Sequence, residues 1–207
     1  MAATRLIPLH VNKGKTLAAS LADRVDYAQN PEKTEGGKLI SSYECDPYTA
    51  SQEFLLSKRL YEQIHGRKQK HDVIAYQIRQ SFEPGEISPE EANQVGYELA
   101  MSFTKGKYSF TVSTHTDRAH IHNHIIFNST SIDGTRKFRN FFLSSYALQR
   151  ASDRICLEHG LSIIETKRYR DRARRTEYPE KQSFRNQLHI SAERNTVFSK
   201  TGMRISE

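Results

Sequence analysis

The sequence contains little cysteine and no long apolar run. Its two cysteines, Cys45 and Cys156, are too few for a disulfide framework and too widely spaced for a metal-binding knuckle. No stretch is long and apolar enough to predict a membrane span, and the first residues, MAATRLIPLHVNKGK, do not have the layout of a secretory signal peptide. These absences argue against a secreted or membrane-spanning protein. We therefore expect a protein that works in a reducing, intracellular compartment.

Positive charge exceeds negative charge, and the excess is concentrated near the end of the chain. The formal net charge is +7, and residues 167–175 (KRYRDRARR) hold six Lys or Arg against one Asp. Such a run with an interleaved tyrosine is typical of binding to a phosphate backbone, although a solvated helix end has the same composition. We predict nucleic acid as the partner, bound by Lys167, Arg168, Arg170, Arg172, Arg174 and Arg175.

Strand and helix patterns alternate along the chain. Apolar residues at alternate positions or in short runs predict strands over 5–11, 39–44, 71–82 and 161–164, and a hairpin over 107–129. Helical periodicity predicts helices over 15–29, 46–65, 88–105 and 143–159. Pro8 indicates an edge strand, and Asp46 is the expected N-cap of the second helix. The fold class is α+β, with a domain over 1–165 and a basic, helical or partly disordered extension over 166–207.

Four of the nine histidines lie within ten residues, His115 to His124 (HTDRAHIHNH). A hairpin that turns at Asp117-Arg118 would pair His115 with His120 and place all four imidazoles on one face, with Ser113 opposite His122 and Thr111 opposite His124. The other face would be apolar apart from Asn123, and would carry Phe110, Val112, Ile121, Ile125 and Phe127. One face is then core, and the other is a metal or phosphate site.

Geometry alone does not select the metal ligands from these four histidines. A register change of one residue would turn His115 to the opposite face and leave His120, His122 and His124 as the set. Asp117 could orient an imidazole through its free N–H, or it could simply begin the turn.

These residues resemble a known family. The stretch HTDRAHIHNHIIFN is similar to the third motif of conjugative relaxases, HxDxxxxHxHxxxN, at His115, Asp117, His122, His124 and Asn128. DYAQNPEKT, residues 26–34, resembles the first motif, which contains the tyrosine, and SFEPGE, residues 81–86, resembles the second. The similarity covers about residues 1–165 and indicates relaxases and mobilization nucleases of the MOBP type, which are HUH endonucleases.

The resemblance implies a fold and an activity. The expected fold is a central antiparallel sheet that carries the histidine hairpin, with helices packed on its other face. The implied reaction is a cut in one strand of origin-of-transfer DNA, in which Tyr27 attacks the scissile phosphate and leaves a 5′-phosphotyrosyl bond and a free 3′-hydroxyl. Because the phosphoester energy is kept in a protein bond, the strand can be rejoined without ATP.

The resemblance also assigns roles to individual residues. It implies that His115, His122 and His124 bind Mg²⁺ or Mn²⁺, of which Mn²⁺ suits imidazole better, with His120 as a neighbour or DNA contact.

Tyr27 lies roughly 80° from the apolar stripe of its helix, so the core does not require it. Ser81 matches a serine that holds DNA, and Asn128 is grouped with the DNA contacts. Gln77 stands where we expect relatives to carry His in an AYH pattern, which weakens a supporting role there.

Other functions fit parts of the sequence. HIHNHII nearly matches the signature of histidine-triad nucleotide hydrolases, but Asn123 stands where that signature has an apolar residue. An HUH replication initiator would also nick with a tyrosine, and a DNA-binding module without catalysis would not need four histidines on one face. For the relaxase, we expect single-stranded and hairpin origin-of-transfer DNA, accessory and coupling proteins as partners, the bacterial cytoplasm as the location, and a longer protein beyond residue 207.

Overall fold

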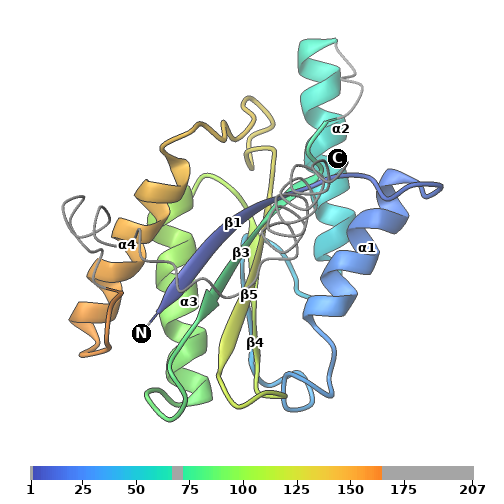
Figure 1. Ribbon diagram of the computed structural model, residues 1–207. Coiled ribbons are helices and arrows are strands. Elements are labelled where there is room, and N and C mark those ends of the chain that lie inside the picture. The colour runs from blue at the N-terminus through green and yellow to red at the C-terminus, as the bar shows by residue number, and fades with distance from the viewer. Residues whose placement is uncertain (1, 67–71, 165–207) are drawn as a thin grey trace, which may run out of the picture. The chain divides into compact units, whose positions relative to one another are not determined.

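The computed structural model describes residues 2–66 and 72–164 of the chain. The predicted extension over 166–207, which includes the six candidate DNA-binding cations of 167–175, lies outside the described residues. In the described part no helix combines the length and the apolar character needed to cross a membrane. Figure 1 shows the elements in chain order, which are β1 (Ala3–Leu9), α1 (Leu17–Ala28), β2 (Ile40–Tyr43), α2 (Ala50–His65), β3 (Ala75–Ser81), α3 (Pro89–Thr104), β4 (Phe110–His115), β5 (His122–Asn128) and α4 (Ser144–Glu158).

The strands form one five-stranded sheet in the order β1-β3-β5-β4-β2, and every neighbouring pair is antiparallel. The histidine hairpin, β4–β5, supplies the middle strand and one of its neighbours. β1 lies at an edge, as Pro8 predicted, because proline cannot donate to a second neighbouring strand. The predicted α+β fold with a central antiparallel sheet is confirmed.

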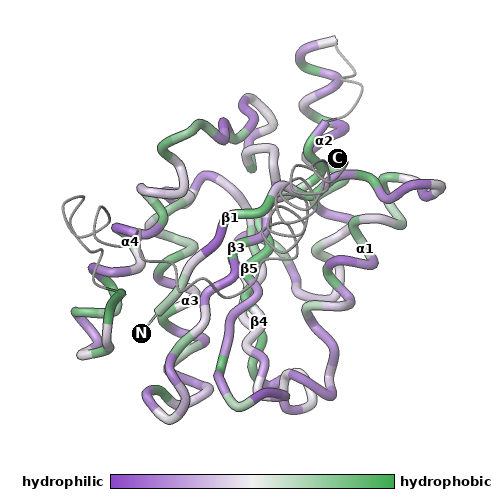
Figure 2. Tube along the Cα trace, in the orientation of Figure 1, coloured by the Kyte–Doolittle hydropathy of each residue, from purple (hydrophilic) through white to green (hydrophobic). Residues whose placement is uncertain are grey.

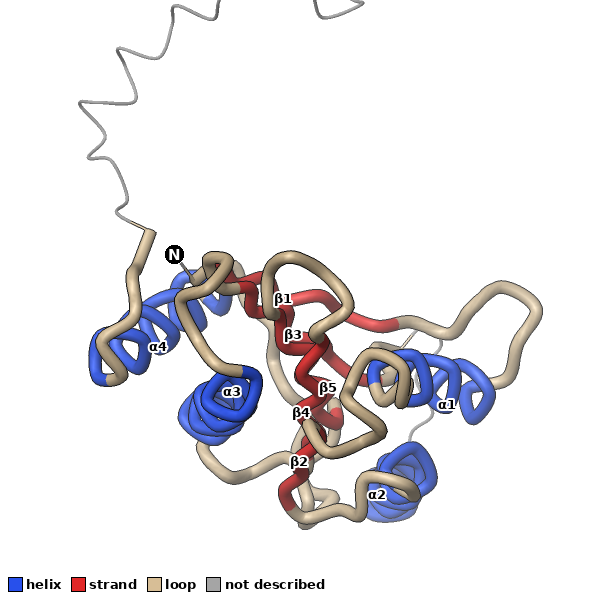
Figure 3. The backbone as a smooth tube through the Cα atoms, turned by 90° about the horizontal axis from the view of Figure 1, so that it is seen from below, coloured by secondary structure: helices blue, strands red, loops and turns tan. Residues whose placement is uncertain are grey.

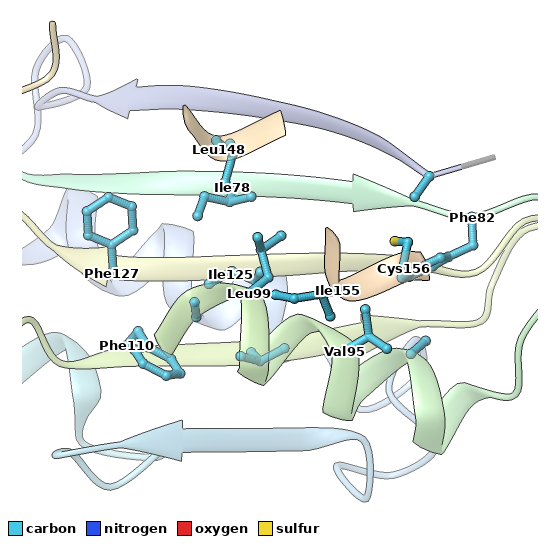
Figure 4. Packing of buried hydrophobic residues seen from close by; sticks show 14 of the residues in the cluster. Ile78, Phe82, Val95, Leu99, Phe110, Ile125, Phe127, Leu148, Ile155 and Cys156 are labelled. Atoms are coloured by element: carbon cyan, nitrogen blue, oxygen red, sulfur yellow. The ribbon is translucent and has the colours of Figure 1, made fainter. Parts of the chain in front are cut away.

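Helices cover both faces of this sheet. In the end-on view of Figure 3, α3 and α4 lie on one side of the strands, and α1 and α2 lie on the other. Figure 4 shows the larger core, in which Leu99 and Val95 of α3 pack against Phe110 and Ile125 of the hairpin. A smaller core joins α1 and α2 to the opposite face through Leu21, Phe54 and Ile126. The sequence predicted only the helices that lie opposite the histidines.

The starts of the helices follow local capping chemistry, with one exception. The Thr16 side chain accepts from the backbone N–H of Ala19 at the start of α1, and Ser88 caps α3 in the same way, immediately before Pro89. Asp46 does not cap α2, so that prediction is wrong. Its carboxylate accepts from the N–H of Tyr48 within a turn, and α2 begins only at Ala50. A side chain that closes a turn is not available to the helix that follows.

α3 packs closely against the hairpin at Gly96. A Cβ at this position would lie 2.5 Å from Nδ2 of Asn123 and 2.9 Å from Cγ1 of Val112. Asn123 is fully buried here, and its amide donates to the carbonyl of Ala92 at 2.6 Å while its oxygen accepts from the Thr114 hydroxyl at 2.7 Å. The polar residue on the apolar face is thus satisfied by hydrogen bonds, as burial requires.

We expect Gly96→Ala to destabilise the fold. Overpacking costs about 1–3 kcal/mol, whereas alanine in a helix gains only about 0.5–1 kcal/mol over glycine, so we expect a net loss of about 1–2 kcal/mol. Urea unfolding measures this free energy. Gln94→Ala, on the exposed side of the same helix, is the control and should stay within about 0.5 kcal/mol. An unchanged free energy for Gly96→Ala would mean that α3 moves away from the hairpin at no cost.

Candidate metal centre and nucleophile

The register of the histidine hairpin differs from the predicted one. His115 pairs with His122, and Ser113 pairs with His124, so each partner lies two residues further along β5 than predicted. The cause is the connection, since residues 116–121 form a loop that is longer than the predicted turn at Asp117-Arg118. Because the shift is an even number of residues, every side chain keeps its predicted face. His120 leaves the ladder and lies in the loop.

Three of the four imidazoles converge. One ring nitrogen from each of His115, His122 and His124 lies within 4.8 Å of the other two. The ring centroids are 4.4 Å apart for His115 and His124 and 5.2 Å apart for His122 and His124. His120 lies beside His122, at 5.4 Å between ring centroids, and is not part of this group. The geometry groups the histidines that the family motif selected, and their role as ligands stays a prediction.

Hydrogen bonds prepare two of these rings for a cation. Nε2 of His115 donates to the carbonyl of Ala28 at 2.8 Å, which leaves Nδ1 with its lone pair. Nδ1 of His122 donates to the carbonyl of His120 at 3.3 Å, which leaves Nε2 free. Burial lowers the pKa of both imidazoles and lowers the pKa of His124 to about 3. Because metal ions bind neutral imidazoles, this group fits a transition-metal ion.

Gln77 on β3 supports the third ring. Its buried side-chain amide contacts Nδ1 of His124 through the amide nitrogen. A half-turn of the amide would present the oxygen instead, which would accept a proton from Nδ1 and leave Nε2 free for a metal ion. The structure thus places the Gln77 amide against His124, and in that orientation it can provide the same acceptor as other second partners of metal-bound histidine, so its supporting role stays a prediction.

Tyr27 lies beside two of the three imidazoles, at the C-terminal end of α1. Its ring centroid is 5.9 Å from that of His124 and 6.3 Å from that of His115. The side chain is exposed, as its position on the flank of the helix predicted. Its neighbour, Ala28, is the residue whose carbonyl accepts from His115. The end of α1 is therefore attached directly to the histidine group.

Lys33 connects the nucleophile candidate to Asp117. Its ammonium lies 4.5 Å above the centroid of the Tyr27 ring and 3.7 Å from the Asp117 carboxylate. The backbone N–H of Thr116 donates to the carbonyl of Lys33 at 3.0 Å, which attaches this segment to the end of β4. Asp117 thus contacts a lysine, whereas the sequence left open whether it orients an imidazole or begins the turn. Figure 2 shows that hydrophilic residues predominate in the loops at this end of the sheet.

β3 brings two further side chains to the histidine face. Ser81 pairs with His122, and Arg79, which is exposed, pairs with His124. Residues that pair directly in an antiparallel sheet lie on the same face, so both are beside the site. Arg79 was not among the residues predicted from the sequence. The two-residue spacing of Gln77, Arg79 and Ser81 indicates that the three side chains share one face of β3. Placing that face beside the histidines required knowledge that β3 pairs with β5.

Asn128 does not lie at this site. It is fully buried at the opposite end of β5, where its amide donates to the carbonyl of Phe54 at 3.4 Å and its oxygen accepts from the N–H of Thr130 at 3.2 Å. Both the amide nitrogen and the oxygen of the side chain are used in hydrogen bonds to the backbone within the fold. The prediction of a DNA contact at Asn128 is therefore wrong. The spacing of a motif can include a residue that serves packing.

Comparison with known proteins identifies relatives. A family model described as relaxase, MobA/VirD2-like, nuclease domain, matches residues 27–161. Protein rlx of Staphylococcus aureus is 34% identical over 73% of this chain and 44% of its own length. The group II intron-interrupted relaxase LtrB of Lactococcus lactis subsp. cremoris is 28% identical over 70% of this chain and 32% of its own length. The chain therefore spans less than half the length of these relatives.

A solved structure shares the fold. The MobM relaxase domain, crystallised with manganese and plasmid oriT DNA, superposes with a TM-score of 0.56 at 12% identity. The match covers 80% of this chain and 90% of that domain.

The buried histidines predict a pH dependence of stability. Their pKa values are lowered by burial, that of His124 to about 3, whereas in the unfolded chain they protonate near pH 6.5. Below about pH 6.5 the unfolded chain binds more protons, so the free energy of unfolding falls as the pH is lowered toward 3. For His115 and His124 we expect a slope of up to about 1.4 kcal/mol per pH unit each, measured by urea unfolding with a chelator present.

Two variants test the sign of this effect. His124→Gln should make the loss of stability on acidification shallower. His159 affects stability in the opposite direction, because the carboxylate of Glu98 raises its pKa. Its contribution to stability is present at low pH and is lost as the pH rises. His159→Gln should therefore make the acid loss steeper. If the free energy of unfolding had the same pH dependence in both variants, other titratable groups would control the loss of stability in acid.

Proposed function

We propose, from the premise that the chain belongs to the MobA/VirD2-like relaxase family, that it nicks one strand of origin-of-transfer DNA with Tyr27 as the nucleophile. The observation that carries this proposal is the position of Tyr27, whose ring centroid is 5.9 Å from that of His124. An exposed phenol beside a group of three neutral imidazoles is suited to covalent attack on a phosphodiester. Neither a histidine-triad nucleotide hydrolase nor a DNA-binding module without catalysis requires this arrangement.

The proposed reaction exchanges one phosphoester for another. The Tyr27 oxygen forms a bond to the scissile phosphorus, and the bond from phosphorus to the 3′-oxygen of the preceding nucleotide breaks. The phenolic proton leaves to solvent or to a base, and the departing 3′-oxygen takes up a proton to become a hydroxyl. The 5′-phosphate stays on the tyrosine. Attack by a 3′-hydroxyl on this phosphotyrosine would rejoin the strand without ATP.

We propose that His115, His122 and His124 hold a divalent metal ion, Mn²⁺ or Mg²⁺. Such an ion supplies positive charge to a non-bridging oxygen of the phosphate as negative charge develops there. Imidazole ligands favour Mn²⁺ over Mg²⁺. The related MobM structure contains manganese, which supports the same assignment here.

The chain's own residues complete the site. The Lys33 ammonium lies 4.5 Å above the centroid of the Tyr27 ring, and Asp117 with the N–H of Thr116 keeps Lys33 in place. Arg79 and Ser81 lie on the same face and can hold the phosphate groups on either side of the cut. Tyr27 therefore has a cation on its ring and phosphate-binding groups across the sheet.

The partners follow from this function. We propose single-stranded and hairpin origin-of-transfer DNA as the substrate, with its backbone bound by residues 167–175, and accessory and coupling proteins of the transfer machinery in the bacterial cytoplasm. The oriT DNA in the MobM structure supports the choice of substrate. The family match favours this function over a replication initiator.

Tyr27→Phe should eliminate cleavage and the covalent adduct. The change removes one exposed oxygen, so folding and DNA affinity should remain within about a factor of two, because binding to the phosphate backbone dominates affinity. The measurement is denaturing gel electrophoresis and mass analysis after incubation with origin DNA. Tyr48→Phe, at an even more exposed tyrosine, is the matched control and should form the adduct normally. An adduct that persists in Tyr27→Phe and maps to another tyrosine would contradict the assignment of the nucleophile.

Gln77→Leu should weaken metal binding. Loss of the amide removes the partner that holds His124 in the ligating tautomer, and such partners contribute about 10- to 100-fold in metal affinity. Titration calorimetry or Mn²⁺ electron paramagnetic resonance measures this affinity without DNA. Gln77→Glu keeps an acceptor oxygen and should restore most of it. Equal affinities in wild type and Gln77→Leu would show that Gln77 only fills space.

A further inference from the structure

A basic and aromatic surface lies at the other end of the sheet. β5 runs from His122 to Asn128, so the segment that follows it is separated from the histidines by about 20 Å along the strand. Figure 1 shows this segment, between β5 and α4, at the end of the sheet opposite the β4–β5 loop. Its sequence over 136–142 is RKFRNFF, a basic stretch with three phenylalanines, which the proposed reaction does not use.

The cations of this surface come from two segments. Arg136 and Arg139 are exposed, and Lys105 and Lys107, from the end of α3, are exposed beside them. Arg139 lines both a cavity of about 680 Å³, shared with Arg136, and one of about 360 Å³, shared with the two lysines. Among the described residues, these four cations make no ion pair.

The nearby carboxylates already have partners. Asp72 pairs with Lys137 and, at 3.7 Å, with Lys58. Asp133 accepts from the hydroxyls of Ser131 and Thr135 within its own turn. Asp133 keeps its negative charge, because hydroxyls do not neutralise a carboxylate, and it interacts with Arg136. One such carboxylate against four exposed cations still leaves the surface positive, and so suited to phosphate groups.

Two phenylalanines of the segment face solvent. Phe141 is 57% exposed and Phe142 is 86% exposed, whereas Phe138 packs inward against Phe127, at 5.0 Å between ring centroids. The backbone around Phe138 is fixed, because its N–H donates to the carbonyl of Ser129 at 2.8 Å. The segment thus has one anchored aromatic ring and two that are presented outward. Exposed apolar rings of this size gain free energy when a flat partner covers them.

We propose that this surface binds single-stranded DNA, with bases stacked on Phe141 and Phe142 and phosphates held by Lys105, Lys107, Arg136 and Arg139. Cations interleaved with exposed aromatic rings are the arrangement by which proteins hold single strands without reading their sequence. At about 3.4 Å per stacked nucleotide, 20 Å corresponds to roughly six nucleotides from the cleaved phosphate. The inference rests on the proposed function in taking DNA as the ligand, but the binding itself requires no cleavage.

Fluorescence tests the stacking directly, because the chain contains no tryptophan. Phe142→Trp in the full chain places a single reporter on the surface, and Tyr48→Trp places one at another site that is 85% exposed. We expect single-stranded oligo(dT) to quench the first reporter strongly and the second little, and a blunt duplex of the same length to quench neither strongly. Equal quenching at the two positions, or none at Phe142→Trp, would overturn the proposal.

Affinity measurements test base stacking and phosphate binding separately. Phe142→Ala should weaken oligo(dT) binding about tenfold while leaving duplex binding nearly unchanged. Arg136→Gln with Arg139→Gln should reduce the slope of log affinity against log salt by about 0.7 for each phosphate that is no longer bound. Lys13→Gln with Arg24→Gln removes the same charge from exposed positions elsewhere and is the control. An equal effect in the control pair, or an equal loss for duplex in Phe142→Ala, would contradict the assigned surface.

The adduct assay separates this inference from the proposed function. At saturating DNA, Phe142→Ala should still form the Tyr27 adduct, since the ring lies far from the histidines. Adduct formation without quenching at Phe142→Trp would refute the second surface and leave the nicking function intact. Quenching without an adduct in any form of the protein would refute nicking and leave the surface intact. Urea unfolding of each variant confirms that its fold is retained.

Discussion

The hydrogen bond from His115 to the carbonyl of Ala28 joins the two halves of the site. The last carbonyls of a helix have no partner within the helix, and this one is satisfied by an imidazole at 2.8 Å. A helix C-terminus favours a positive charge, but burial has the larger effect and lowers the pKa of His115, so the ring stays neutral. One hydrogen bond therefore sets the tautomer of a candidate ligand and places Tyr27, the preceding residue of α1, beside the histidines.

The histidine face works because its polarity changes along the strand. On β5, His122 and His124 precede Ile126, and the three alternate residues share one face. Ile126 packs with Leu21 and Phe54 in the core beneath α1 and α2, so these helices cover only that end of the face. At the histidine end, His115 and His124 are buried beside the end of α1, and His122 is partly exposed. Tyr27, the proposed nucleophile, lies at this end of the face, beside His115 and His124.

The sequence was sufficient to predict the parts of the site that depend only on the alternation of side chains between the two faces of a strand. Alternation assigned His122 and His124 to one face and Ile125 to the other, although the predicted register was wrong, because an even shift preserves parity. Arg79 and Gln77 were not placed, since their position depends on the pairing of β3 with β5. Amphipathicity indicates that α1 buries one side, but it does not say against which face of a sheet. Tyr27 was selected by its motif, and its proximity to the histidines required the packed structure.

The proposed use of imidazole ligands in place of carboxylates has an electrostatic consequence. Carboxylates would cancel much of the charge of a divalent ion, whereas three neutral imidazoles leave that charge available to a phosphate oxygen. Burial keeps the rings neutral, and the nearby carboxylate, Asp117, lies against Lys33 and so does not add net negative charge. Arg79 adds a further cation on the same face. In the proposed reaction, the site would attract the phosphodiester through its own cations and keep the charge of the ion for the negative charge that develops during attack, which is the difference that lowers a barrier.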